Sequence, residues 1–306
     1  MRSPLAGWRA VVAVALLVGL VFWVQTQVGW ATVLEAWQRV APADAALVVC
    51  LTVIGYLARA WRLGAHFGAP LSERPGACLR VMVLHNAINN LLPMRTGEAS
   101  FPLLLRRDFG IGTARSVAAL LWLRTLDLAA LGLVVAITLG IARHGLTVGV
   151  LGVLIAFGAP VLLWRGLRRD FAGPHFAARL LGLLKQGLPG DLSTLVRTQA
   201  WTLLHWTAKL AAYAWLVARL GGIDPVPSIL AAVAGEATSV LPIHGVAGAG
   251  TYEAGVLAVL RPLGVPLEDA VQAAVNLHLF LLMASIAAAA VALVVPREKR
   301  SPGSPS

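Results

Sequence analysis

Long, nearly uninterrupted runs of apolar residues are the feature that most restricts how this chain can fold. A helix needs roughly 20 residues to cross the hydrocarbon core of a bilayer. Six runs approach or exceed that length, at residues 10–28, 43–57, 117–141, 146–164, 192–220 and 270–295. Each is expected to form a full membrane span, so the sequence predicts an all-α, polytopic transmembrane helix bundle.

Composition excludes several other classes of protein. Hydrophobic residues make up 58% of the chain and charged residues 13%, and the mean hydropathy is +0.78. A soluble domain carries about 25% charged residues. A soluble enzyme, a disordered protein and a disulfide scaffold are therefore excluded. Cys50 lies inside an apolar run and Cys78 in an arginine-rich loop, so a metal site is not indicated, and no metal or cofactor is expected.

Two further apolar segments, residues 79–105 and 229–260, are interrupted near their middles by Pro and Gly. Each is long enough for two half-membrane helices joined by a turn. Such backbone is tolerated at membrane depth only where it lines a cavity or is buried in protein. We therefore expect six full spans plus two re-entrant helical hairpins. Together they would form a single transmembrane domain over residues 1–296, followed by a short basic tail at residues 297–306.

The distribution of charge orients this bundle. The chain has 25 Lys and Arg against 14 Asp and Glu, a net charge of +11. If both hairpins return to the side they left, most of these cations, Arg59 and Arg62 among them, fall on the side of the N-terminus. Cytoplasmic loops carry such an excess, so both termini are expected in the cytoplasm and the protein in the inner (plasma) membrane. Topology and anionic lipid explain the charge, and no nucleic-acid partner is expected.

The two broken segments resemble each other. Each combines a Leu-Pro pair with glycines and one glutamate, and the expected turn residues are Asn90, Pro93, Gly97 and Glu98 in the first and Pro242, Gly248, Gly250 and Glu253 in the second. The first hairpin would enter from the cytoplasm and the second from the opposite face. An inverted repeat of this kind is typical of transporters with a site at the midplane. The alternative is chance similarity between two stretches rich in Ala, Leu and Gly.

Two longer stretches carry a family resemblance. NNLLPMRTGEASFPLLLRRDFGIGTARSVAALLWLRTLDLAAL and LPIHGVAGAGTYEAGVLAVLRPLGVPLEDAVQAAVNLHLF resemble the two signatures of the lysylphosphatidylglycerol synthase transmembrane-region family, also called flippase-like. The resemblance covers roughly residues 8–296 and implies translocation of an aminoacylated phospholipid between leaflets. The sequence departs from the family pattern after Glu98, at the doubled glycine, and at His278, where an Arg is common. Lipid-aminoacylating relatives carry an extra soluble domain, so synthase activity is not implied here.

Charged side chains inside the spans are the candidates for contact with a lipid headgroup. Lys209 lies near the middle of residues 192–220, where a charge costs about 2.5–3.5 kcal/mol. Arg197, Trp201 and His205 precede it at four-residue steps, so the four side chains share one drifting helix face. This stripe suits either an anionic headgroup or polar contacts between helices.

Further candidates lie in the third span and in the two turns. Arg124 and Asp127 are close enough to form an ion pair on one helix face, and Arg124 is alternatively a phosphate ligand. Arg95 and Glu98 flank Gly97, where half-helix ends can hold an anion, and Glu253 occupies the matching position of the second turn. Glu236 is another carboxylate in an apolar segment; its protonation would lower the cost of burial, which is compatible with proton coupling.

The sequence thus predicts a headgroup-binding set rather than a catalytic one: Arg95, Glu98, Arg124, Asp127, Arg197, His205, Lys209 and Glu253. The expected function is the flipping of an anionic phospholipid or lipid-linked headgroup between leaflets, with membrane lipids as the partners. One alternative is a non-transporting accessory subunit of a lipid or glycan pathway. Another is a membrane enzyme acting on a lipid phosphate, for which the sequence offers no cluster of nucleophiles or metal ligands.

Overall fold

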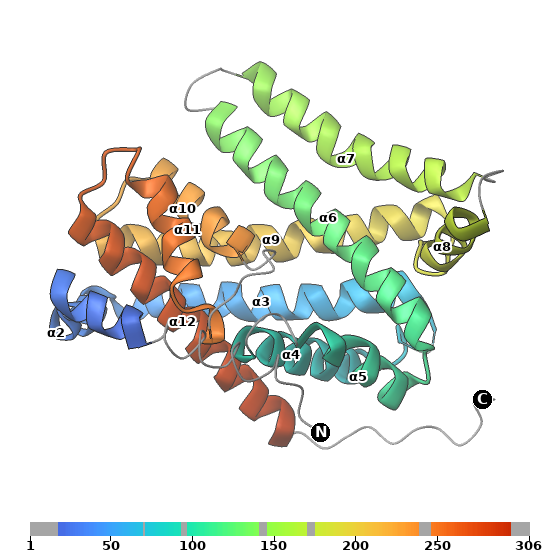
Figure 1. Ribbon diagram of the computed structural model, residues 1–306, viewed down its shortest axis with the longest axis horizontal. Helices are drawn as coiled ribbons and strands as arrows, with labels where there is room; N and C mark the ends of the chain where they lie inside the picture. The colour runs from blue at the N-terminus through green and yellow to red at the C-terminus, as the bar shows by residue number, and fades with distance from the viewer. Residues whose placement is uncertain are drawn as a thin grey trace. The chain divides into compact units, whose positions relative to one another are not determined.

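The computed structural model describes residues 18–69, 71–92, 97–140, 146–169, 175–238 and 246–294, and in this part the chain forms helices and connecting turns without a β-strand. The longer helices are α3 (Pro42–Phe67), α4 (Pro75–Leu91), α6 (Thr113–Leu139), α7 (Leu146–Arg168), α9 (Leu192–Gly221) and α12 (Leu267–Val294) (Figure 1). The shorter ones are α2 (Trp30–Glu35), α5 (Ser100–Phe109), α8 (His175–Lys185), α10 (Pro225–Thr238) and α11 (Thr251–Leu260), with 3₁₀ turns at Ala36–Arg39 and Val246–Gly248. The predicted all-α class is confirmed.

Four of the predicted spans are confirmed as helices long and apolar enough to cross a membrane, namely α3, α6, α7 and α12. Helix α9 meets this standard only together with α10, and the two are bent by 119° at the break between them. The described residues therefore hold four candidate spans, or five if the bent pair is one span. Residues 18–27 are helical, and residues 10–17 of the predicted first span lie outside the described residues.

The described residues belong to two compact units. The first unit comprises residues 1–53, 86–98 and 208–290, and the second comprises residues 54–85, 99–207 and 291–306. Because the unit boundaries fall inside α3, α4, α9 and α12, each of these helices contributes residues to both.

Glycines allow close backbone contacts within the first unit. A Cβ on Gly97 would lie 2.4 Å from the Cα of Asn89, so this turn can pass α4 only without a side chain. In the pair α10–α11, a Cβ on Gly235 would meet the Tyr252 ring at 2.5 Å. Small residues at helix contacts are typical of membrane proteins, because they let helices approach closely.

The second turn of the first unit has unusual backbone. Gly248 and Gly250 have φ angles of +83° and +82°, which glycine adopts without a steric penalty. Ala247 also has a positive φ, of 53°, and is the non-glycine residue with this property among the described ones. The turn leads directly into α11, whose first-turn Glu253 accepts a hydrogen bond from the Gly250 N–H at 2.8 Å.

The second unit is built around a conventional apolar core and a well-capped helix. Leu63, Leu71, Phe101 and Leu105 are fully buried in that core. At the start of α9, the Thr194 N–H and the Ser193 hydroxyl both donate to the carboxylate of Asp191 at 2.7 Å. These hydrogen bonds hold the pKa of the exposed Asp191 carboxyl below its usual range.

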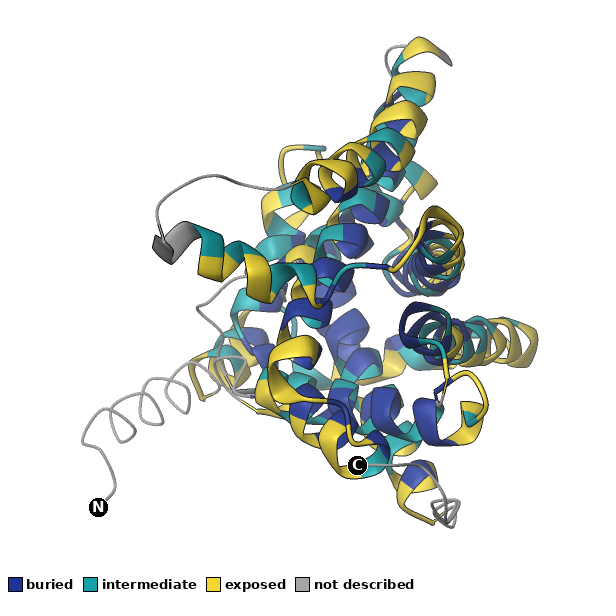
Figure 2. Ribbon diagram, turned by 90° about the vertical axis from the view of Figure 1, so that its right-hand side faces the viewer, coloured by how far each residue is buried: buried dark blue, intermediate teal, exposed yellow. Residues whose placement is uncertain are grey.

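Large apolar side chains are exposed along the candidate spans. On α7, Leu154, Ile155 and Leu162 are 62%, 65% and 70% exposed. Figure 2 shows such exposed faces in yellow on helices whose other faces are buried and dark blue. A contiguous apolar surface of this kind is unfavourable in water and is suited to lipid.

Candidate functional site

Three arginines and one aspartate gather in the second unit. Arg59 and Arg62 lie one helical turn apart on α3, and Arg124 and Asp127 lie one turn apart on α6. Arg62 and Asp127 form an ion pair, and both are buried, with 3% and 6% exposure. Two buried charges of opposite sign are tolerated when they are paired and hydrogen-bonded.

Asp127 is the centre of this cluster. Its Oδ2 lies 3.9 Å from the Nη1 of Arg124, which confirms the predicted pairing within α6. Its Oδ1 accepts a hydrogen bond from the Trp206 Nε1–H at 2.9 Å, in addition to the contact with Arg62. Asp127 is thus held from both sides, and its position does not depend on Arg124 alone.

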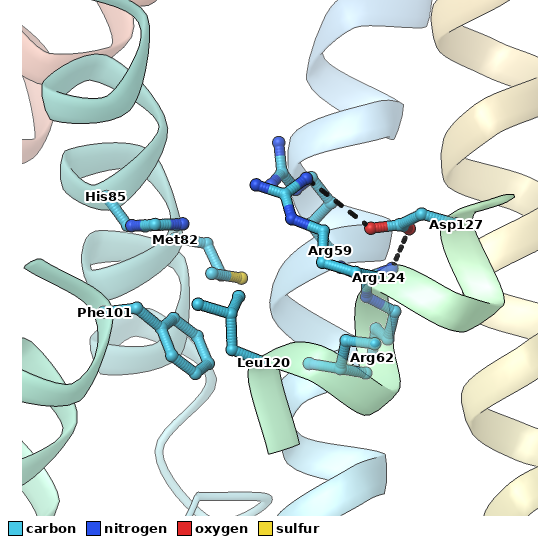
Figure 3. A pocket seen from close by; sticks show the side chains of 9 residues that line it. Arg59, Arg62, Met82, His85, Phe101, Leu120, Arg124 and Asp127 are labelled. Carbon is cyan, nitrogen blue, oxygen red and sulfur yellow. Dashed lines mark hydrogen bonds and ion pairs between the residues drawn. The ribbon is translucent and has the colours of Figure 1, made fainter. Parts of the chain in front are cut away.

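The cluster forms one side of a pocket. Arg59, Arg62, Arg124 and Asp127 line it together with His85 and the apolar side chains Met82, Phe101, Leu120 and Leu123 (Figure 3). The open space among these side chains is small, about 10 Å³, which is room for a single water molecule. His85 is positioned by a 2.9 Å hydrogen bond between its Nδ1 and the Ser100 hydroxyl.

The charge of this pocket is unbalanced. Three guanidinium groups face one carboxylate among the described residues that line it. Guanidinium groups form paired hydrogen bonds with phosphate and carboxylate oxygens. The arrangement therefore attracts an anion, although its side chains have to move apart to admit one. Met82, Phe101 and Leu120 form its apolar wall.

A second group of charged residues lies in the first unit. The Nζ of Lys209 lies 2.6 Å from the Oε2 of Glu236, and the same ammonium group is 5.3 Å from the centre of the Tyr213 ring. Lys209 was predicted to face a headgroup. In the structure its charge is matched by a carboxylate from α10.

Glu253 and His278 form the other pair of the first unit. The Oε1 of Glu253 and the Nδ1 of His278 are 2.6 Å apart, and the two residues are 2% and 5% exposed. The Nε2 of His278 lies 2.7 Å from the carbonyl oxygen of Ala247, and the Tyr252 ring stacks on the imidazole at 4.6 Å. This network joins α12 to the turn that precedes α11.

The predicted headgroup residues are divided between the two units. Arg124 and Asp127 come together in the pocket, whereas Lys209 and Glu253 lie in the other group. Arg197 is exposed on α9, and His205 is buried with its Nδ1 3.1 Å from the carbonyl oxygen of Gly55.

The turn residues are only partly described. Glu98 is half-buried and directly follows Gly97, and the side-chain amide of Asn90 donates to the Ser285 hydroxyl at 2.8 Å. Arg95, Pro93 and Pro242 lie outside the described residues.

Arg59 and Arg62 are the pocket residues that sequence reasoning assigned to another role. They were counted as cytoplasmic charges because the apolar run was taken to end at Leu57, whereas α3 continues to Phe67. The predicted end of the span was wrong, and Arg62 lies within α3, buried against Asp127. Their spacing by three residues on an extended helix was the available signal.

Comparison with known families identifies the chain. The sequence pattern of the lysylphosphatidylglycerol synthase TM region matches residues 10–289. The chain belongs to this family. A comparison with curated proteins finds no match. With its apolar candidate spans, this family member is a multi-pass integral membrane protein with a lipid-related role. In the described part of the chain, no three His, Cys, Asp or Glu side chains are grouped as metal ligands would be.

Proposed function

We propose that this protein moves the headgroup of an anionic phospholipid, or of a lipid-linked anion, between the two leaflets of the membrane. The observation that carries the proposal is the surplus of positive charge in the pocket of the second unit, where Arg59, Arg62 and Arg124 face Asp127. Charged side chains within a membrane protein are expensive, and such residues usually lie on a substrate pathway. A phosphate-bearing headgroup would be attracted to this group of guanidinium side chains.

Membership of the family also supports this proposal. The family is named for the transmembrane region of a lysylphosphatidylglycerol synthase, and lysylphosphatidylglycerol is a membrane lipid. We further propose the finer topology predicted from the sequence, with six spans and two opposed re-entrant hairpins in the inner membrane and both termini in the cytoplasm. Such hairpins would bring polar turns to the midplane, where a headgroup must pass while its acyl chains stay in the bilayer. In this mechanism the protein makes and breaks no covalent bond and needs membrane lipids as its only partners.

The test is lipid exchange by purified protein in liposomes. A fluorescent phosphatidylglycerol probe is placed in both leaflets, and the fraction that reaches the outer leaflet is followed by chemical quenching. The wild-type protein is expected to accelerate exchange of this probe more than that of a zwitterionic phosphatidylcholine probe. A wild-type protein that exchanges no anionic lipid would contradict the proposal and favour an accessory subunit.

The decisive variant is Arg124→Gln. Asp127 keeps Arg62 and Trp206 as partners in this variant, so the fold is expected to persist. Loss of one charged hydrogen-bonding group costs about 1.5–3 kcal/mol, which corresponds to a roughly ten- to hundredfold slower exchange. Arg165→Gln is the matched control, because Arg165 is exposed on α7. Equal rates in the two variants would show that Arg124 does not contact the headgroup.

A further inference from the structure

The contact between α12 and the turn before α11 restricts where protons can lie on His278. His278 places each of its ring nitrogens against an oxygen acceptor: Nδ1 against Glu253 Oε1 at 2.6 Å, and Nε2 against the Ala247 carbonyl oxygen at 2.7 Å. A carbonyl oxygen can only accept, so the Nε2 must carry a proton and donate it. Whether a proton also lies between Nδ1 and Glu253 then determines the net charge of the pair formed by Glu253 and His278.

One further proton must lie between Glu253 and His278. If it resides on Nδ1, the pair is an imidazolium and a carboxylate; if it resides on Oε1, the pair is a neutral imidazole and a carboxylic acid. In both cases the pair holds one proton more than a neutral imidazole facing a carboxylate. Without this proton, the Nδ1 lone pair would face a negatively charged oxygen at hydrogen-bond distance, which is repulsive.

The rest of the carboxyl group is fixed by the turn. The Glu253 Oε2 accepts the Gly250 N–H at 2.8 Å, so Oε1 is the oxygen presented to His278. The ring of Tyr252 stacks on the imidazole at 4.6 Å and is itself packed against Gly235. These contacts leave the pair little freedom to avoid the repulsion by small rotations.

Among the described residues, the neighbouring charged groups do not compensate for loss of this proton. From α10, Glu236 adjoins Gly235 and is paired with Lys209 of α9 at 2.6 Å. From α11, Glu253 and Tyr252 face His278 directly. Because the Lys209–Glu236 pair is neutral overall, loss of the proton would leave the pair of Glu253 and His278 with a net negative charge at a buried place.

We propose that Glu253 and His278 form a proton-binding site, in which one exchangeable proton holds α12 to the turn at residues 246–250. On opening, the proton between Nδ1 and Oε1 passes to water, and His278 leaves the Ala247 carbonyl. No covalent bond other than this N–H or O–H bond is formed or broken, and no oxidant or reductant is needed. The proposal concerns proton binding and local opening, and it holds whether or not the protein moves lipid.

Hydrogen exchange of the turn measures this linkage. The wild-type protein in nanodiscs is followed by mass spectrometry on peptides covering residues 246–250, between about pH 7 and pH 9. An imidazole open to water has a pKa of about 6.5 and is neutral over this range, so opening releases the proton. The opening equilibrium of the turn is therefore expected to rise about tenfold per pH unit, beyond the intrinsic effect of pH on exchange chemistry.

Glu253→Gln separates a proton-binding site from a merely structural contact. The glutamine amide can donate to the Nδ1 of a neutral His278 while its oxygen accepts the Gly250 N–H, so the contact persists without an exchangeable proton. The excess pH dependence is expected to vanish and the turn to stay protected up to pH 9. The same slope in Glu253→Gln and in the wild type would overturn the proposal.

Two further variants complete the test. Glu268→Gln removes an exposed carboxylate from the same helix as His278 and is expected to keep the wild-type slope. Loss of the slope in this control would assign the effect to net charge and overturn the proposal. His278→Gln removes the titrating ring itself and must also lose the slope, which keeps the proposal testable if Glu253→Gln fails to fold. A wild-type slope in His278→Gln would overturn it as well.

Discussion

The two units of this protein solve the problem of buried charge in opposite ways. In the second unit, three arginines face a single carboxylate, so the group carries a surplus of positive charge. In the first unit, Lys209 is matched by Glu236, and Glu253 is matched by His278. A group of this kind attracts an anion. A balanced group needs no such ligand, and its charge changes only when a proton enters or leaves.

The largest difference between the units is expected when one carboxylate is neutralised in each. Asp127→Asn leaves Arg62 buried without a counter-charge, and breaking a buried ion pair in this way costs about 3–5 kcal/mol. Glu236→Gln is expected to cost less, because the Lys209 side chain is 17% exposed and its flexible stem can carry the ammonium towards water. Thermal unfolding of both variants in the same zwitterionic nanodiscs gives the comparison, and equal losses of stability would contradict it.

The same two variants also sharpen the contrast between a ligand site and a balanced pair. If the arginine pocket binds an anion, nanodiscs containing phosphatidylglycerol should raise the unfolding temperature of Asp127→Asn more than that of Glu236→Gln. A lipid effect of the same size on both would mean that the surplus charge is not what the anionic lipid recognises.

A smaller difference in stability is expected between variants of Trp206 and Tyr252, the aromatic neighbours of the two charged groups. The Trp206 Nε1–H donates to Asp127, so Trp206→Phe removes a hydrogen bond to a charged group and should cost about 1.5–3 kcal/mol of unfolding free energy. The buried hydroxyl of Tyr252 has no hydrogen-bond partner in the described part of the chain, so Tyr252→Phe should leave stability unchanged or raise it. Chemical denaturation of the two variants tests this, and a comparable loss in Tyr252→Phe would reveal a hidden role for its hydroxyl.

The smallest effect belongs to an exposed carboxylate, which sets the baseline for the buried ones. Hydrogen bonds to the ionised cap lower the pKa of Asp191, so its stabilisation of α9 is present above the unfolded value of about 3.9 and is lost as the pH falls through the lower folded value. Asp191→Asn keeps the capping geometry and should flatten the acid limb of unfolding temperature against pH, with little change at pH 7. An unchanged acid limb would show that the cap does not contribute.

Much of the helical framework could be predicted from the sequence. The apolar runs at residues 117–141, 146–164 and 270–295 correspond to α6, α7 and α12, because a run of this length can hide its backbone only in a helix. The pairing of Arg124 with Asp127 was also predictable, since residues three apart share a helix face.

The composition of the candidate site was less accessible. Arg62 pairs with a residue 65 positions away, and no local pattern distinguishes a buried arginine of this kind from one at the membrane surface. In the same way, the sequence did not indicate which residue His278 would contact. Its contact with Glu253 arises from the packing of α12 on α11, which apolar periodicity does not specify.

The backbone of Ala247 stores conformational strain in the turn before α11. A left-handed conformation costs a residue with a side chain roughly 1–2 kcal/mol, and Ala247 adopts it with φ 53° and ψ 22°. The hydrogen bond from His278 to the carbonyl oxygen of Ala247 helps to hold the residue in this strained conformation. When this hydrogen bond is lost, Ala247 can leave the left-handed conformation without added free energy. Closing the turn again requires that free energy to be supplied.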